Sequence, residues 1–145
     1  MKIERILWPT DFSENAAEAL PYATSLTEKY GAEIHILYVL KEYPAVGVHY
    51  GEYDPGDIEK MQRWEKEMAE KRLDEICEKF LNQCPLFIRH IRVGDPANEI
   101  LGLIQKENID LVIMANRGSE SHFDFGSVAD HVLKCTTVPV VLIPV

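Results

Sequence analysis

Two glycines and a serine lie where a strand and a helix are expected to meet near the C-terminus. An apolar strand run follows Asp110, and a helix is predicted to begin at Ser127. The polar loop between them carries Gly118 and Gly126. Glycine lets the backbone approach a ligand closely, and the first N–H groups of a helix attract anions. The stretch is therefore typical of a phosphate-binding loop, unless the glycines only shape a tight connection and Ser127 is an ordinary N-cap.

A carboxylate lies at a second connection of this kind, near the N-terminus. Residues 5–9 form a short apolar run closed by Pro9, as expected for a strand that is buried on both faces. Asp11 lies between this strand and the next predicted helix. Open parallel sheets place their ligand crevice at such connections. Asp11 is thus a candidate to accept hydrogen bonds from a ligand, with Pro9 and Thr10 beside it. The alternative is a turn in which its carboxylate bonds its own backbone.

The common catalytic motifs are absent from the chain. There is no Gly-x4-Gly-Lys-Ser/Thr phosphate loop, no Gly-x-Gly-x-x-Gly after the first strand, and no Gly-x-Ser-x-Gly elbow. His122, Asp124 and Ser127 lie close in sequence, but this proximity does not establish the geometry of a nucleophile and its base. We interpret them as polar loop residues and expect weak hydrolysis of a bound ligand at most.

Strand and helix patterns alternate along the chain. This alternation predicts a parallel sheet with helices on both faces, a doubly wound, Rossmann-like α/β fold in a single domain over residues 1–145. The expected strands cover residues 5–9, 33–40, 86–93, 111–115 and 138–143, and the expected helices cover residues 14–30, 57–82, a segment from 96, and 127–135.

Three local features refine these helices and strands. The first helix has Ser13 as N-cap and Gly31 as C-terminal stop, and Pro21 is expected to kink it. Trp64, at the edge of the apolar stripe of the long helix, is expected to be partly buried, with contact to a partner as the alternative. His90 has no ligand-spaced histidine beside it, so a metal site is not expected there.

The connection between residues 41 and 57 is rich in proline and glycine and is predicted to be irregular. It carries aromatic residues that could cover a ligand as a lid or simply lie on the surface. They are Tyr43, His49, Tyr50 and Tyr53.

Composition limits the classes of partner. The chain has 145 residues, 46% hydrophobic and 27% charged, which suits one globular domain. Its formal net charge of −9 argues against nucleic acid or anionic membrane as a partner. It has no apolar signal region at its N-terminus and no membrane-length apolar run, so a cytoplasmic location is expected. The three cysteines lack Cys-x-x-Cys spacing, which favours reduced thiols.

Several segments resemble the universal stress protein family. Residues 114–132 resemble its C-terminal signature, which reads Gly-x2-Gly-x9-Gly-Ser/Thr in nucleotide-binding members. Residues 8–13 (Trp-Pro-Thr-Asp-Phe-Ser), 37–39 (Leu-Tyr-Val) and 93–96 (Val-Gly-Asp-Pro) resemble its other conserved segments. The sequence departs from the signature in two ways. The first glycine of the signature is Ala115 here, and seven residues rather than nine separate Gly118 from Gly126.

The resemblance implies the strand order 3-2-1-4-5 and a site for an adenine nucleotide, ATP, ADP or AMP. In that order the crevice between strands one and four brings the turn at Asp11 to the glycine loop. Asp11 would bind the ribose or adenine, and the backbone at Val39 would lie near the adenine edge unless Val39 is simply core. Glu120 and Asp124 would oppose the phosphates unless Mg²⁺ bridges them. The implied contacts are Pro9, Thr10, Asp11, Val39, Met114, Ala115, Arg117, Gly118, Gly126, Ser127 and Val128.

The last strand suggests a second function class. Residues from Val138 to Ile143 are apolar, and the implied order places them at the edge of the sheet, where unpaired backbone invites association. The resemblance implies a homodimer through this strand. The alternative to nucleotide binding is therefore a homodimeric regulatory module that binds no nucleotide.

Overall fold

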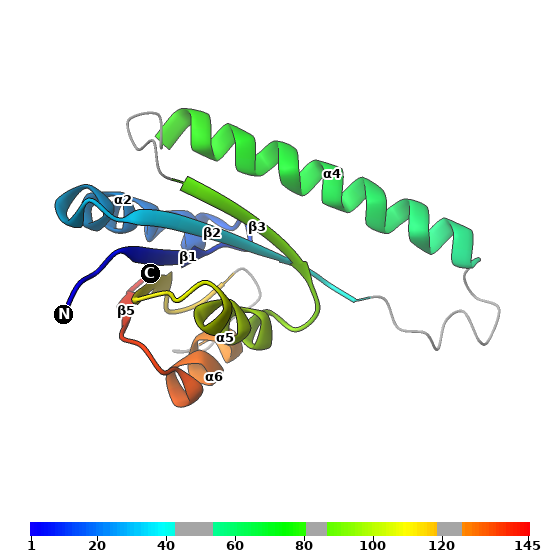
Figure 1. Ribbon diagram of the computed structural model, residues 1–145. Helices are drawn as coiled ribbons and strands as arrows, with labels where there is room; N and C mark the ends of the chain where they lie inside the picture. Colours follow the sequence, from blue (N-terminus) through cyan, green and yellow to red (C-terminus); the bar gives the residue numbers. More distant parts are fainter. Residues whose placement is uncertain (43–53, 81–86, 119–125) are drawn as a thin grey trace.

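The computed structural model describes residues 1–42, 54–80, 87–118 and 126–145. Five parallel strands form one sheet in the order β3-β2-β1-β4-β5, with helices on both faces (Figure 1). The predicted doubly wound α/β fold and the implied strand order are both confirmed. The elements in chain order are β1 (Arg5–Pro9), α1 (Glu14–Glu18), α2 (Leu20–Tyr30), β2 (Glu33–Leu40), α4 (Pro55–Phe80), β3 (Phe87–Val93), α5 (Pro96–Lys106), β4 (Leu111–Ala115), α6 (Ser127–Cys135) and β5 (Val140–Ile143).

Some predicted features lie outside the described residues. These are the aromatic residues considered as a lid, the last two positions of the long helix with the first position of the strand after it, and the centre of the glycine loop with Glu120, His122 and Asp124.

Two layers of side chains hold the helices on the sheet. Ile6 and Trp8 of β1 point to the face covered by α2 and α4, and Leu7 points to the face covered by α5 and α6. We call these the α4 face and the α6 face. Each of the three is at most 1% exposed, as expected for a central strand of a parallel sheet. The indole Nε1 of Trp8 also donates to the carbonyl of Ala16 at 3.1 Å, which attaches α1 to β1.

The first predicted helix is divided into α1 and α2. Ser13 caps α1 by accepting a hydrogen bond from Ala16 N at 3.1 Å, and Gly31 ends α2 with φ 62°, as expected. Between them, Ala19 ends α1 and Pro21 lies in the first turn of α2. Proline has no N–H and fits best in a first turn, so the expected kink becomes a break into two helices.

Helix α4 packs on the sheet only over its C-terminal half. Ala69, Leu73 and Cys77 are at most 4% exposed, whereas Met61 and Trp64 are 46% and 62% exposed. The expectation that Trp64 is partly buried is therefore wrong. The reason is visible in Figure 1, where α4 continues past the carboxyl ends of the strands and leaves the sheet surface behind. Among the described residues no helix, α4 included, has the length and apolarity needed to span a bilayer.

Strands β3 and β5 form the two edges of the sheet. The burial of β3 alternates only in part, as predicted for an edge. Strand β5 begins at Val140, two residues later than predicted. Pro139 lacks the N–H that a ladder position needs, although its carbonyl accepts a hydrogen bond from Val112 N at 3.0 Å.

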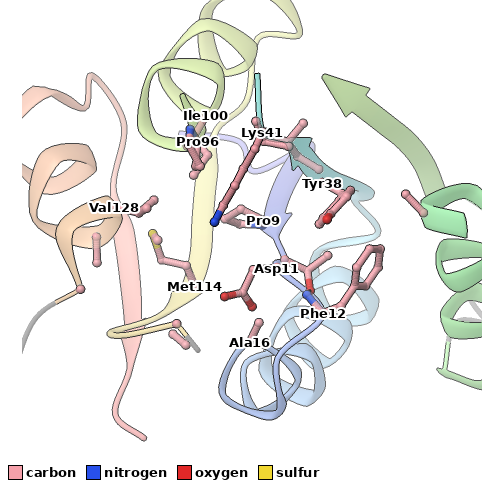
Figure 2. A pocket seen from close by; sticks show the side chains of 18 of the residues that line it. Pro9, Asp11, Phe12, Ala16, Tyr38, Lys41, Pro96, Ile100, Met114 and Val128 are labelled. Atoms are coloured by element: carbon pink, nitrogen blue, oxygen red, sulfur yellow. The ribbon is translucent and has the colours of Figure 1, made fainter. Parts of the chain in front are cut away.

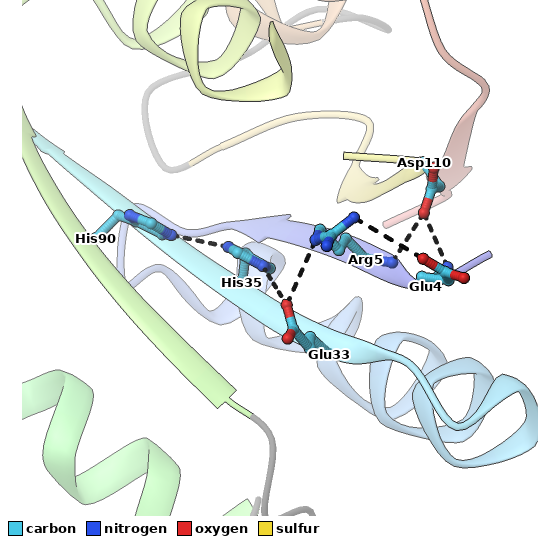
Figure 3. A network of polar contacts seen from close by, with 6 residues as sticks. All are labelled: Glu4, Arg5, Glu33, His35, His90 and Asp110. Carbon is cyan, nitrogen blue, oxygen red and sulfur yellow. Dashed lines mark hydrogen bonds and ion pairs between the residues drawn. The ribbon is translucent and has the colours of Figure 1, made fainter. Parts of the chain in front are cut away.

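A chain of polar side chains links three strands on the α6 face (Figure 3). His35 Nδ1 lies 2.9 Å from His90 Nε2, and His35 Nε2 lies 3.2 Å from Glu33 Oε2. Since a carboxylate only accepts, a neutral His35 donates from Nε2 and accepts at Nδ1 from His90. Arg5 Nε completes the chain 3.6 Å from the Glu33 carboxylate. His90 thus has a histidine partner that sequence spacing did not suggest, but the described residues contain no cluster able to hold a metal.

Burial of His90 in this row of polar side chains makes the stability of the fold sensitive to acid. Desolvation and, to a smaller extent, the neighbouring His35 lower the pKa of His90 from 6.5 to about 4. Of the charged groups near the ring, Arg92 and Lys106 also lower the pKa, and Glu107 raises it. Between pH 6.5 and 4 the unfolded chain therefore binds a proton at this residue that the folded chain does not.

We predict that His90 reduces the free energy of unfolding as the pH falls from 6.5 to 4, by about 3 kcal/mol in total. Urea denaturation across this range should give a smaller pH dependence for His90→Leu than for the wild type. His131→Gln is the matched control, because His131 is exposed on α6. An unchanged pH dependence in His90→Leu would contradict the prediction.

Candidate functional site

A cleft of about 990 Å³ opens at the carboxyl ends of β1, β2 and β4 (Figure 2). Every residue that the sequence indicated as a ligand contact lines it, so the fold gathers positions from both ends of the chain. These residues are Pro9, Thr10, Asp11, Val39, Met114, Ala115, Arg117, Gly118, Gly126, Ser127 and Val128.

The topology creates this cleft. Strand β1 pairs with β2 on one side and with β4 on the other. After β1 the chain enters α1 on the α4 face, and after β4 it leads to α6 on the opposite face. The two connections diverge, and a crevice opens between them at the switch point of the sheet.

Asp11 takes part in the turn that enters α1. Its Oδ1 accepts hydrogen bonds from Ser13 N at 2.9 Å and from the Ser13 hydroxyl. The backbone-turn alternative is therefore present in the structure. The other oxygen, Oδ2, faces Gly118 so closely that a Cβ at Gly118 would lie 2.6 Å from it. Asp11 thus has one carboxylate oxygen in its own turn and one directed at the glycine loop.

The two ends of the glycine loop are packed together. Gly126 N donates to Asn116 O at 2.9 Å, and a Cβ on Gly126 would lie 3.2 Å from Arg117 Cα. Gly126, rather than Ser127, is the N-cap of α6. Asn15 Nδ2 also donates to Gly118 O at 3.2 Å, which attaches the loop to α1. Both glycines are therefore positions where another group lies too close for a Cβ: a carboxylate oxygen at Gly118 and the backbone at Gly126.

Arg117 has an unsatisfied donor at this site. Its Nε is buried and has no hydrogen-bond partner within the described ranges. A buried guanidinium N–H without an acceptor costs free energy. An anionic oxygen in the cleft would remove this cost.

Several lining residues were not identified from the sequence. Phe12 and Tyr38 are next to predicted ligand contacts in the sequence, but aromatic side chains at these positions are typical of a core. Lys41 follows β2, and Figure 2 shows its amine directed into the cleft. The long helix contributes Trp64, Glu65, Met68, Ala69 and Arg72. No local pattern indicated them, because only the packing angle of α4 brings them to the strand ends.

The charges along the cleft wall balance. Among the described lining residues the cations Lys41, Arg72 and Arg117 face an equal number of carboxylates, which are Asp11, Glu65 and Asp130. Burial, together with the Glu65 carboxylate, raises the pKa of Tyr38 above its ordinary value of 10.0. Its hydroxyl therefore stays protonated near neutral pH and can donate a hydrogen bond.

Comparison with known proteins points to one family. A family model described as "Universal stress protein family" matches residues 2–144. The universal stress protein MJ0531 of Methanocaldococcus jannaschii is 29% identical over 143 residues, covering 97% of this chain and 81% of its own. The solved structure of MJ0577, from the same organism, has a TM-score of 0.85 at 26% identity and covers 100% of this chain and 98% of its own. The structure of an Archaeoglobus fulgidus universal stress protein in complex with dAMP shares the fold, with a TM-score of 0.67 at 18% identity and 99% coverage of both chains.

Gly118→Ala is predicted to destabilise the fold by about 1–2 kcal/mol, because the new methyl group would displace a carboxylate held by Ser13. Thermal or urea unfolding measures the effect. Gly102→Ala is the control: it lies within α5 with nothing near its Cβ position, and helix propensity predicts a gain of about 0.5–1 kcal/mol. Equal stability changes in the two variants would show that the contact between Asp11 and Gly118 is not tight.

Proposed function

Because the chain belongs to the universal stress protein family, we propose that it is a stress-response protein that binds an adenine nucleotide in the cleft between β1 and β4. The observation that carries this proposal is the buried Nε of Arg117, which has no acceptor among the described residues. The cleft around it has backbone approach at two glycines and the start of a helix. These are features of an anion site.

The residues of the cleft divide by chemistry into three groups. Arg117, Gly118 and the first backbone N–H groups of α6, at Ser127 and Val128, are suited to phosphate. Asp11 Oδ2 is an acceptor for ribose hydroxyl groups. The apolar surface of Pro9, Val39, Met114 and Ala115 suits a purine ring, with Thr10 at the base of the cleft. A nucleotide has both an anion for the phosphate-binding groups and a planar base for the apolar surface.

The balance of charge favours a nucleotide with few phosphates. Each carboxylate that faces a phosphate at 4 Å costs about 1 kcal/mol even in bulk water. Asp11, Glu65 and Asp130 line the same cleft as the cations. AMP and ADP therefore suit the site better than ATP, which would bring more charge and call for Mg²⁺.

The relatives support an adenine ligand. The Archaeoglobus fulgidus protein, which shares the fold, was solved in complex with dAMP, an adenine nucleotide with one phosphate.

We predict that Arg117→Met weakens AMP binding by about tenfold to a hundredfold, because the variant keeps the length of the side chain but loses a charge-assisted hydrogen bond. Isothermal titration calorimetry with AMP tests this. Arg63→Met is the control, since Arg63 is exposed on α4 outside the cleft lining. Wild-type protein that gives no binding signal with millimolar AMP, ADP or ATP would refute the proposed function.

A homodimer through the last strand is a second proposal, and it is compatible with the first. Strand β5 is an edge of the sheet, and Val141 is 36% exposed there. A short strand flanked by Pro139 and Pro144 offers little backbone pairing, so side chains would supply most of the contact. If no nucleotide binds, a dimeric regulatory module is the remaining function.

Val141→Glu should convert a dimer into a folded monomer, because it places a charge in an apolar two-fold contact. Sedimentation equilibrium measures the mass, and circular dichroism checks the fold. Ile88→Glu is the control on the opposite edge, where Ile88 is 39% exposed on β3. A wild-type protein that remains monomeric at high micromolar concentration would exclude this interface.

A further inference from the structure

The cleft extends beyond the proposed nucleotide contacts, toward α4. Figure 2 shows Asp11 near its middle, with Met114, Val128 and Pro96 on one side and the rings of Phe12 and Tyr38 on the other. The second side is completed by residues of α4. We call it the aromatic compartment, and it is lined by Phe12, Tyr38, Trp64, Glu65, Met68 and Arg72.

Phe12 is held in this compartment by a strained backbone. Its φ is 64°, in the left-handed region that bulky side chains rarely adopt. Its N–H donates to Thr10 Oγ1 at 3.0 Å, which helps to hold this conformation. The Phe12 and Tyr38 ring centroids are 4.3 Å apart, and the guanidinium carbon of Arg72 lies 5.4 Å from the Phe12 centroid. Strain of this kind concentrates at binding sites.

The α4 side of the compartment exposes large apolar side chains that the core does not use. Trp64 is 62% exposed and Met68 is 36% exposed, and they are one helical turn apart. Both line the cleft. Aromatic faces with an arginine beside them form a stacking platform for a planar base.

We propose that the aromatic compartment binds the second base of a dinucleotide whose two nucleosides are joined by a diphosphate. This inference rests on the proposed function, which places the first nucleotide between β1 and β4. The two halves of the cleft meet at Asp11, and each half contains one arginine: Arg117 on the glycine loop and Arg72 on α4. The diphosphate spans the region between these cations.

Size and charge favour this ligand over a longer mononucleotide. The cleft volume of about 990 Å³ lies at the upper end of the range for small-molecule sites, roughly 300–1,000 Å³. A diphosphate bridge carries two negative charges for two nucleosides. This low charge suits a cleft wall in which cations and carboxylates are equal in number and little positive charge is left over. The Tyr38 hydroxyl and the Glu65 carboxylate supply a donor and an acceptor for the edge of the second base.

Calorimetric titration with two matched ligands tests the proposal. Diadenosine diphosphate carries both bases, whereas ADP-ribose carries the same diphosphate and both sugars but lacks the second base. The wild-type protein should bind diadenosine diphosphate about tenfold more tightly than ADP-ribose, because stacking of one base is worth this much. Equal affinities for the two ligands would overturn the inference, and AMP binding in the same protein would leave the proposed function standing.

The Trp64→Ala variant tests whether the second base stacks on α4. It should remove the tenfold advantage of diadenosine diphosphate while leaving ADP-ribose affinity within about twofold. Met61→Ala is the control, because Met61 is 46% exposed one turn earlier on α4 and does not line the cleft. An advantage that survives in Trp64→Ala would overturn the proposal. Failure of AMP, ADP-ribose and diadenosine diphosphate alike would refute the proposed function and this inference with it.

Discussion

The pairing of β1 between β2 and β4 is the constraint on which the rest of the structure depends. Strand β1 connects to β2 on one side of it, and β4 connects to β5 on the other, so right-handed crossovers place the two sets of helices on opposite faces of the sheet. The helices that follow, α1 and α6, therefore start at the same strand ends but diverge. The cleft is a consequence of this divergence, and so is the meeting of Asp11 with a loop from the other end of the chain.

Close contact, rather than open space, defines the glycine loop. Asp11 Oδ2 occupies the room that a side chain at Gly118 would need, and Arg117 Cα does the same at Gly126. The described ends of the loop, held this tightly, present their backbone donors in a fixed arrangement, which lowers the entropic cost of binding an anion. Ala115, which takes the place of a motif glycine, ends the buried strand β4 and does not lie in the loop.

Sequence reasoning identified the elements well because their signals are local. The caps at Ser13 and Gly31 depend on a few neighbouring residues, and each forms as expected. Features that depend on tertiary geometry were missed. The contact of His35 with His90 requires the register of β2 against β3, in which Leu37 is opposite His90. The exposure of Trp64 requires knowing how far α4 extends beyond the sheet, and no local pattern indicated the positive φ of Phe12.

The two tryptophans of the chain occupy opposite environments, and this makes them separable optical probes. Trp8 is 1% exposed and hydrogen-bonded to α1, whereas Trp64 is 62% exposed beside the cleft. A buried indole emits at shorter wavelength and is shielded from aqueous quenchers such as iodide, and an exposed indole is not. Intrinsic fluorescence therefore contains one signal from the centre of the sheet and one from the cleft wall. A ligand that stacks on α4 would alter only the quenchable, longer-wavelength part, and loss of the fold would alter both.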